Sequence, residues 1–232
     1  MKTKLLLIIT MVITLSGLKN VNAQSIAAEQ YYNIQPLLNY PHAEDKKTDD
    51  VAGTPYLNDQ WAMGVVKLAD GRTYKDVLLK YDEARGVLYF QDKKVQTLTF
   101  VDPVSEFKIN YIANDQPKEE TFKNGFENIP GSSELSFFKV LSDGTAQLIK
   151  KTAKIQVETK EYNRPLIKSF QDDSKYYLIV SGKVLPFKKN KKFILANLDN
   201  KQVELESYMK NNNVDLKSDA DLSKLITYYN SL

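Results

Sequence analysis

Short segments in which apolar and polar residues alternate are the feature that most limits how this chain can fold. Phe107, Ile109 and Tyr111, for example, alternate with polar residues such as Lys108. A period of two is typical of an antiparallel strand that buries one face. Several such segments follow one another between residues 61 and 188, separated by turn sequences. The pattern predicts a body built from short antiparallel strands.

Two Asp-Gly pairs, at residues 70–71 and 143–144, predict tight β-hairpins, because glycine accepts the positive φ that such turns require. The segment from Lys154 to Lys160 alternates again, which predicts that Ile155 and Val157 point inward. A polar interval is expected after Ile112. The expected strands are 61–68, 73–81, 87–90, 95–101, 104–112, 135–141, 146–150, 154–160, 176–180 and 183–187.

The end of the chain has a helical pattern instead. Asn190 is expected to cap a first helical turn. Ser218, followed three residues later by Asp221, resembles a capping box. After it, an apolar stripe has the spacing of one helix face. The stripe consists of Leu222, Leu225, Ile226 and Tyr229.

Strands first and helices later predict an α+β fold, in which an antiparallel β meander or sandwich-like body packs against C-terminal α-helices. The expected organisation is an export signal (1–23), an N-terminal arm or linker (24–60), the β region (61–188) and the C-terminal helices (189–232). An outer-membrane barrel shares the pattern of short alternating strands. The helical tail and the strands with two polar faces argue against that alternative.

The first residues have the order of charge and hydrophobicity of a secretory signal peptide. Lys2 and Lys4 precede an apolar run from Leu5 to Leu15, and small residues favour cleavage between Ala23 and Gln24. The apolar run is short for a membrane-spanning helix, which needs about 20 residues. We therefore expect an exported protein that is soluble in the periplasm or outside the cell after cleavage.

The sequence contains no cysteine. A bacterial lipoprotein carries its lipid on a cysteine at the first mature position, so no lipid anchor is expected. Disulfides, thiolate metal sites and cysteine nucleophiles are excluded with it. No second apolar run is long enough to predict a transmembrane span in the mature chain.

Removal of the signal changes the charge balance of the protein. The chain has 32 basic and 29 acidic residues, and Lys2, Lys4 and Lys19 lie in the signal, which has no acidic residue. The mature chain therefore carries equal numbers of both and is formally neutral. A nucleic-acid partner is not expected, because binding to phosphates depends on net positive surfaces.

Positive charge is nevertheless concentrated between residues 146 and 192. The densest group is Lys183, Lys188, Lys189, Lys191 and Lys192. Lysines of this kind often protect a strand edge from unwanted pairing. The alternative is a binding site for an anionic glycan, an anionic lipid headgroup or an acidic envelope protein.

Sequence signatures of catalysis are missing. His42 is the single histidine and has no neighbouring partner for nucleophilic or metal chemistry. No glycine-rich phosphate loop and no calcium-loop spacing occurs. No cofactor or metal is expected. A pair of carboxylates assembled in space stays open as a hydrolytic site, since sequence spacing does not reveal it.

Aromatic residues offer one more kind of site. Trp61 is the single tryptophan, and the chain has 14 tyrosines. Flat rings stack on sugars, but tyrosine is also a favoured strand residue with an apolar body and a polar tip. Core or cross-strand packing is therefore the favoured role of the tyrosines, and a glycan-binding platform is the alternative.

Several longer segments resemble a group of exported proteins of Bacteroidetes. They are Gly53–Trp61, Leu68–Tyr74 and Asp221–Asn230, together with the signal ending Asn22-Ala23-Gln24. The shared motifs are turns and helix caps. The resemblance implies an exported location and implies no particular activity.

These observations favour a non-catalytic envelope protein that binds another macromolecule or helps assemble a surface complex. A second hypothesis is a glycan-binding module that uses Trp61 and exposed tyrosines with the lysine-rich region 183–192. A third is a hydrolase that uses carboxylates. Enzymatic activity is the less favoured outcome.

Overall fold

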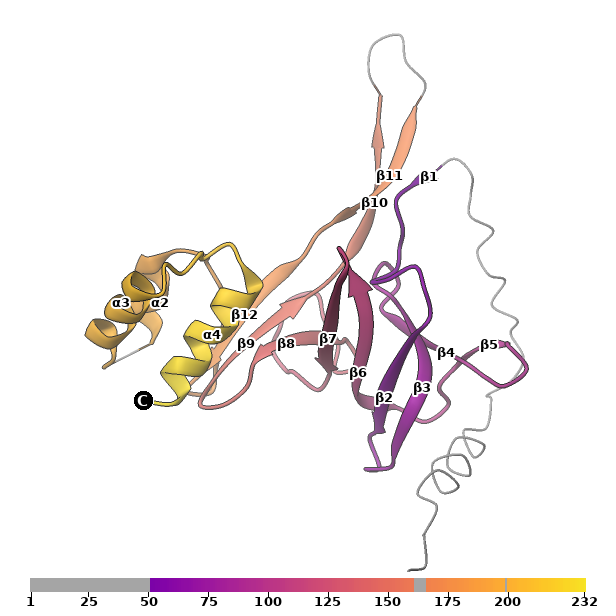
Figure 1. Cartoon of the computed structure of the whole chain (residues 1–232), viewed down its shortest axis with the longest axis horizontal. Helices are drawn as coiled ribbons and strands as arrows, with labels where there is room; N and C mark the ends of the chain where they lie inside the picture. The colour runs from indigo at the N-terminus through magenta and orange to yellow at the C-terminus, as the bar shows by residue number, and fades with distance from the viewer. Residues whose placement is uncertain (1–50, 161–165, 199) are drawn as a thin grey trace, which may run out of the picture.

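The computed structural model describes residues 51–160, 166–198 and 200–232. It has the α+β fold expected from the sequence, with an antiparallel β body followed by C-terminal helices (Figure 1). The expected signal peptide, most of the expected N-terminal linker and His42 lie outside the described residues. No helix among the described residues is long and apolar enough to cross a membrane.

Ten of the described strands form one antiparallel sheet in the order β13-β12-β9-β8-β7-β6-β2-β3-β4-β5. Successive strands are mostly neighbours, as in a meander. The strands are β2 (Ala62–Leu68), β3 (Thr73–Asp82), β4 (Val87–Gln91), β5 (Thr97–Thr99), β6 (Val104–Ala113), β7 (Gln116–Lys123), β8 (Phe138–Ser142), β9 (Ala146–Lys151), β12 (Lys175–Val180) and β13 (Lys183–Pro186).

The half of this sheet that contains β2 to β7 curls on itself around an aromatic core. Phe107 of β6 and Phe122 of β7 stack with ring centroids 4.7 Å apart. Tyr81 of β3 also lies 5.1 Å from Phe122, although β2 and β6 separate their strands in the sheet. Gly64 of β2 allows β2 and β6 to lie close together at this point. A Cβ atom at residue 64 would lie 2.2 Å from the Lys108 carbonyl oxygen of β6.

The other half of the sheet is covered by α2 (Lys191–Asn197), α3 (Gln202–Asn211) and α4 (Asp219–Asn230) (Figure 1). An aliphatic core lies between helices and sheet. It includes Leu148, Leu178, Ile194, Leu198, Leu205, Leu222, Leu225 and Ile226. The sequence predicted two of the helix caps correctly: Asn190 accepts from the Phe193 amide at 2.8 Å, and Ser218 accepts from the Asp221 amide at 3.3 Å.

The C-terminal end of α4 is fixed to the turn between β8 and β9. The side chain of Asn230 accepts from the Ala146 amide and donates to the Ala146 carbonyl, both at 2.8 Å. Gly144 in that turn has a φ of 150°, and a Cβ there would lie 2.7 Å from Asn230 Nδ2. Glycine therefore serves both the turn and the approach of the helix.

A second sheet projects from the body. It consists of β1 (Val51–Ala52), β11 (Ile167–Asp172) and β10 (Lys154–Thr159), in the order β1-β11-β10. Strands β10 and β11 are antiparallel continuations of β9 and β12, and they stand clear of the body in Figure 1. We call β10 and β11 together the projecting hairpin.

The structure confirms both predicted Asp-Gly hairpins, which join β2 to β3 and β8 to β9. The predicted polar interval after Ile112 is wrong in part, because it contains β7, a strand inside the large sheet. Strand β11 was not predicted. The inward orientation predicted for Ile155 is also wrong: 45% of this residue is exposed, because the described residues do not bury this side chain.

Candidate functional site

The five lysines singled out in the sequence lie at the helical end of the large sheet, and two of them form ion pairs. Lys183 lies in β13, Lys188 and Lys189 in the following connection, and Lys191 and Lys192 at the start of α2. Lys189 lies 3.3 Å from Asp219, and Lys191 lies 3.0 Å from Glu206. Lys183, Lys188 and Lys192 form no ion pair with a described residue.

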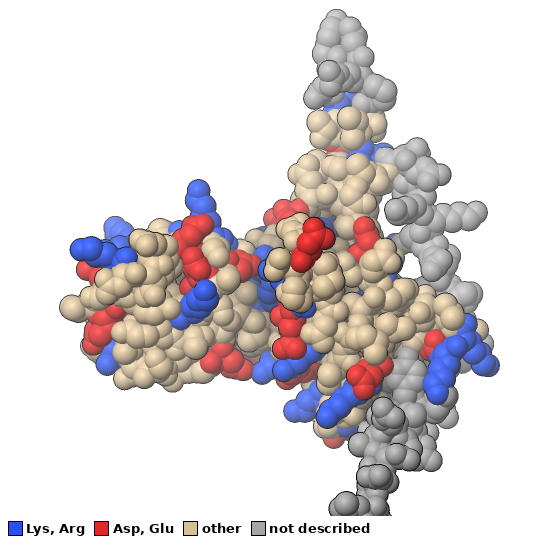
Figure 2. All heavy atoms as spheres, in the orientation of Figure 1, with Lys and Arg blue, Asp and Glu red and all other residues tan. Residues whose placement is uncertain are grey.

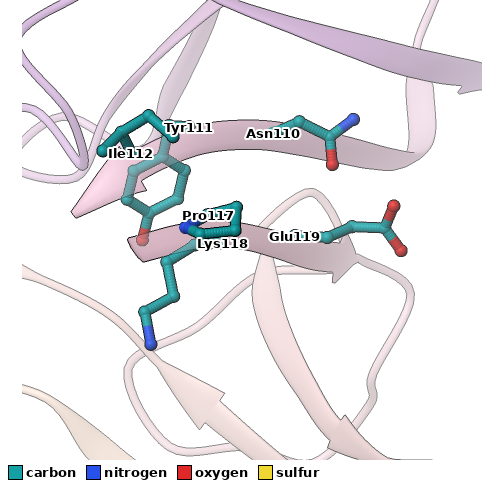
Figure 3. A pocket seen from close by; sticks show the side chains of 6 residues that line it. All are labelled: Asn110, Tyr111, Ile112, Pro117, Lys118 and Glu119. Atoms are coloured by element: carbon teal, nitrogen blue, oxygen red, sulfur yellow. The ribbon is translucent and has the colours of Figure 1, made fainter. Parts of the chain in front are cut away.

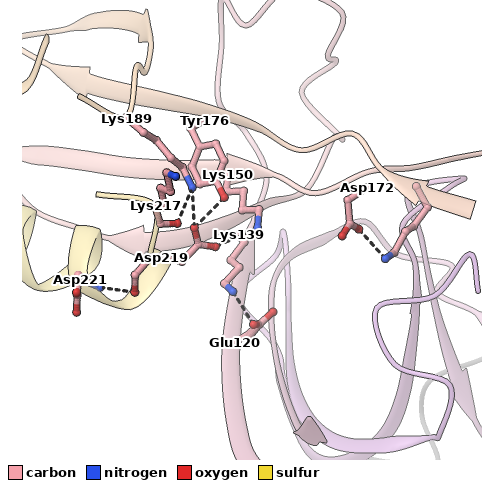
Figure 4. A network of polar contacts seen from close by, with 11 residues as sticks. Glu120, Lys139, Lys150, Asp172, Tyr176, Lys189, Lys217, Asp219 and Asp221 are labelled. Atoms are coloured by element: carbon pink, nitrogen blue, oxygen red, sulfur yellow. Dashed lines mark hydrogen bonds and ion pairs between the residues drawn. The ribbon is translucent and has the colours of Figure 1, made fainter. Parts of the chain in front are cut away.

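Asp219, the first residue of α4, is the centre of a polar network between helix and sheet (Figure 4). It accepts from the Tyr176 hydroxyl at 2.8 Å and from Lys150 Nζ at 3.0 Å. Lys189 Nζ lies 3.8 Å from the centre of the Tyr176 ring. Burial alone would raise the pKa of Asp219, but the hydrogen bonds from Tyr176 and Lys150 outweigh it and hold that pKa below its usual range.

This network gives Lys189 a structural task, because it holds the N-terminal end of α4 on the sheet. The part of the lysine group that is free for an anionic partner is therefore smaller than the sequence indicated. In Figure 2 the visible surface of the helical end carries acidic and basic side chains side by side. The arrangement is closer to a mixed, solvated surface than to a concentrated positive site.

Trp61 lies immediately before β2, at the other half of the large sheet. Lys80 Nζ is 4.2 Å from the centre of the Tyr56 ring and 5.8 Å from that of Trp61. Several strands separate Trp61 from β13 in the sheet order. The structure therefore does not bring Trp61 and the lysines together in one site.

A hollow of about 310 Å³ lies at the end of the hairpin formed by β6 and β7 (Figure 3). Ile112 and Pro117 supply apolar surface, while Asn110 and Glu119 lie further along the strands. The hollow is open to solvent. It contains no cluster of groups with evident catalytic geometry.

Buried carboxylates gather where the body meets the projecting hairpin. Glu83, which follows β3, is buried, and burial raises its pKa. Glu120 of β7 lies 2.5 Å from Lys139 Nζ. Burial and the nearby charge of Glu120 also raise the pKa of Tyr111. Within the described ranges, no group of three or more acidic or histidine side chains is arranged to hold a metal ion.

The projecting hairpin differs from all these places because residues on both of its faces are exposed, such as Gln156 on one face and Ile155 on the other. One face carries cross-strand ion pairs, Lys154 with Asp172 at 2.6 Å and Lys168 with Glu158 at 3.4 Å. The opposite face is richer in apolar residues and, as the register shows, consists of Ile155, Val157, Thr159, Ile167, Ser169 and Gln171. Ile155 is 45% exposed and Ile167 is 50% exposed. The visible surface of the hairpin in Figure 2 is mainly uncharged.

The outer edge of β10 is open along most of its length. Asp173 donates its amide to the Ala153 carbonyl, so odd-numbered residues of this strand direct their backbone groups toward β11. The backbone groups of Lys154, Gln156 and Glu158 therefore point to the outer edge. At the base of the hairpin, the Lys154 amide reaches the Glu83 carbonyl at 3.4 Å. Beyond that contact, no described strand pairs with this edge.

The two outer strands of the large sheet are less suited to pairing. Strand β5 has three residues, and β13 has four, including Lys183 and Pro186. Short length, lysine and proline are common means of protecting a strand edge. Strand β10 has six residues, no proline and no bulge in its pairing with β11. Its edge is the one in the described part of the chain that is best suited to accept another strand.

Comparison with known proteins does not add to this geometry: no family model, curated protein or solved structure matches the chain. The candidate site therefore rests on the structure alone. The alternation of residues 154–160 predicts the strand β10 but does not predict its open edge. No signal in the sequence shows that edge, because an edge is defined by the order of all the strands in the sheet.

Proposed function

We propose that this is a non-catalytic envelope protein that binds another protein or helps assemble a complex, and that the projecting hairpin is its binding element. The observation that carries the proposal is the open edge of β10, which has neither proline nor a bulge, beside a partly exposed apolar face. Monomeric proteins normally cover or interrupt such edges, because an unpaired row of amides and carbonyls attracts other strands. An edge kept open on a projection is suited to a partner.

The mode of binding that fits this geometry is strand addition. A partner in extended conformation pairs with the outward backbone groups of Gln156 and Glu158, and main-chain hydrogen bonds supply affinity. The β10 side chains of the apolar face, Ile155 and Val157, lie beside the added strand and favour partners with apolar residues at alternate positions.

The proposed place of action is the envelope, reached by export with cleavage between Ala23 and Gln24 and without a lipid anchor. The support is the signal-like sequence of residues 1–23, the lack of cysteine and the resemblance to exported Bacteroidetes proteins. Mass spectrometry of the protein recovered from the periplasm or medium should give a chain that begins at Gln24. Recovery of the uncleaved chain in the cytoplasm would contradict the location.

The binding proposal is tested by removing one backbone donor from the edge. Gln156→Pro removes an outward-facing amide and leaves the hydrogen bonds to β11 intact, since proline is tolerated at strand edges. Gln156→Ser is the matched control, because it shortens the side chain and keeps the amide. Tagged protein is used to capture proteins from an envelope extract, including untagged copies of the same chain.

Capture by the wild type and by Gln156→Ser, with loss in Gln156→Pro, is the expected result. Equal capture by all three forms would remove the edge from the binding site. Failure of the wild type to retain anything would count against a binding function of the hairpin. Circular dichroism of the three proteins checks that the fold is unchanged.

A further inference from the structure

The side chains of β10 are arranged so that the strand is complementary to itself. Lys154 and Glu158 stand at equal distances on either side of Gln156, and Ile155 and Val157 stand directly beside it. From this we infer that the edge accepts the β10 strand of a second copy of this chain, antiparallel and centred on Gln156. The inference rests on the proposed function and deepens it by naming the partner.

In that register, Lys154 of each copy lies opposite Glu158 of the other. Each of these charges already has an opposite charge on β11, at Asp172 and Lys168. The pairing therefore produces rows in which negative and positive groups alternate across both copies. Opposite charges directly across a strand pair are stabilising, and like charges are destabilising.

On the other face, Ile155 of each copy lies opposite Val157 of the second. Ile155, which is exposed in the single chain, thus meets the partly buried Val157 across the new pair, which reduces the apolar surface in contact with water. Charges on an edge strand usually prevent association. Here the twofold axis through Gln156 places Lys154 of one copy opposite Glu158 of the other. The same charges therefore favour this one register.

The backbone satisfies the same register. The residues of β10 that direct their amide and carbonyl groups outward are the even-numbered ones, and the pairing sets Gln156 against Gln156 and Lys154 against Glu158. Both are pairs of outward-directed residues, as an antiparallel ladder requires. In the single chain the Lys154 amide reaches the Glu83 carbonyl at 3.4 Å, so the Glu158 carbonyl of the second copy has to displace Glu83 from this position.

Other registers lack this match. A parallel, in-register pair sets Lys154 against Lys154 and Glu158 against Glu158. An antiparallel pair centred on Glu158 sets two carboxylates against each other. Like charges directly opposite are unfavourable in both cases. The register centred on Gln156 is the one that pairs each charge of β10 with its opposite.

A cysteine cross-link tests the pairing, and the chain offers a clean background because it contains no cysteine. Gln156→Cys places two thiols across the twofold axis, where the Cα atoms of a hydrogen-bonded pair are about 5.5 Å apart, within disulfide range. Mild oxidation with diamide should give a covalent dimer. Glu158→Cys is the control, because the two introduced thiols would be separated by about 13 Å along the strands.

Cross-linking of Gln156→Cys alone supports the register. Cross-linking of both variants to the same extent would indicate a parallel or non-specific association and overturn it. No cross-linking of either, at protein concentrations up to the millimolar range, would overturn the inference as well. Reduction with dithiothreitol should return the covalent dimer to the starting species.

A charge exchange tests the register without a covalent bond. Glu158→Lys alone sets lysines against lysines in both symmetric pairs, and Lys154→Glu alone sets acids against acids. Each variant should self-associate about tenfold more weakly than the wild type in sedimentation velocity. Mixed together, the two variants should recover association, because each introduced charge then meets its opposite in the other chain. An unrecovered mixture would contradict the antiparallel register.

The proposed binding function of the β10 edge and the proposed pairing of two copies can be refuted independently. A chain that sediments as a monomer, but whose capture of a different envelope protein is lost in Gln156→Pro, refutes self-pairing and leaves the binding edge in place. A chain that neither self-associates nor loses any binding in Gln156→Pro refutes both. Self-association that Gln156→Pro abolishes and Gln156→Ser retains supports both.

Discussion

The ten-stranded sheet and the projecting hairpin are built from similar strands in very different surroundings. In the sheet, Phe107 and Phe122 are fully buried and stack on each other. In the hairpin, Ile155 and Ile167 are about half exposed. Both regions alternate apolar and polar residues along their strands. The difference lies in what covers the apolar face.

The comparison shows that alternation specifies two faces and does not by itself bury either of them. In the body, the curl of the sheet and the helices α2 to α4 supply the cover. Burial of a large apolar side chain contributes about 1.5–3 kcal/mol, and the hairpin leaves much of this gain unrealised. Under the proposed function, this face is the surface that a partner covers.

The largest effect is expected from truncating the aromatic core of the body. Phe107→Ala leaves a cavity among Tyr81, Phe122 and Phe137 and should lower the free energy of unfolding by about 3–5 kcal/mol. The matched change in the hairpin, Phe170→Ala, should lower it by about 1 kcal/mol or less, because Phe170 is half-buried at the surface. Urea denaturation measures both. Equal losses of unfolding free energy in the two variants would contradict the difference in burial between body and hairpin.

A smaller effect is expected from the network that fixes α4 to the body. Asp219→Asn removes the charge that Lys150 and Lys189 face and should lower the free energy of unfolding by about 1–3 kcal/mol near neutral pH. The pKa of Asp219 lies below its ordinary value of 3.8. Its contribution is therefore present above that value and is lost as the pH falls through the folded-state pKa.

The difference between wild type and Asp219→Asn should consequently shrink in acid. Urea denaturation between pH 2 and 7 measures it, and amide hydrogen exchange should show faster opening of α4. Asp173→Asn is the control, because Asp173 makes an exposed, long contact of 3.8 Å with Lys175 and should change stability little. A difference that stays constant down to pH 2 would contradict the role of the carboxylate.

The junction between body and hairpin should respond to pH in the opposite direction. Burial raises the pKa of Glu83 above its ordinary 4.5. Stability is therefore favoured below 4.5 and decreases as the pH rises through the folded-state pKa of Glu83. Glu83→Gln keeps the shape and removes the titration, so this decrease should be smaller in the variant. Thermal unfolding between pH 4 and 9 checks it; an unchanged pH profile would refute this prediction.

The smallest effect on stability is expected at the apolar face of the hairpin. The double substitution Ile155→Ser and Ile167→Ser should change the free energy of unfolding by no more than about 0.5 kcal/mol, since both side chains are already half exposed. The same variant should bind its partner more weakly in the capture experiment. A large loss of stability would show that this face belongs to the folded body.

Local features of the structure were predictable from the sequence, and distant contacts were not. The Asp-Gly turns and the N-cap at Ser218 depend on neighbouring residues, and both are present. The reciprocal half of the capping box is not formed, because the Ser218 amide donates to the Asp215 carbonyl and the Asp221 carboxylate accepts from the Asp215 amide. Strand β7 escaped prediction because most of its residues are polar and exposed, although it pairs fully with β6. The ion pair between Lys189 and Asp219 joins residues that are 30 positions apart in the sequence. Their spacing along the chain does not predict this contact.

The candidate site shows the same limit. The sequence contained the strand 154–160 and its alternation, but whether a strand lies inside a sheet or at its edge depends on every other strand. Strand β11, its single partner among the described strands, was not predicted at all. The lysine group was visible in the sequence as a run of positive charge. The acidic residues that form ion pairs with Lys189 and Lys191 lie in α4 and α3, so they were not visible in the same run.

Strand β1 gives the molecule a particular order of assembly. Val51 pairs in parallel with Lys168 of β11, whereas β2 to β9 mostly pair with strands that are near them in the chain. Contacts between residues far apart in sequence carry a high entropic cost of loop closure and form slowly. During synthesis, β2 to β7 can pair before β11 has been made. Strand β1, the first described strand, is thus among the last to pair, and it pairs only after β11 of the projecting hairpin has formed.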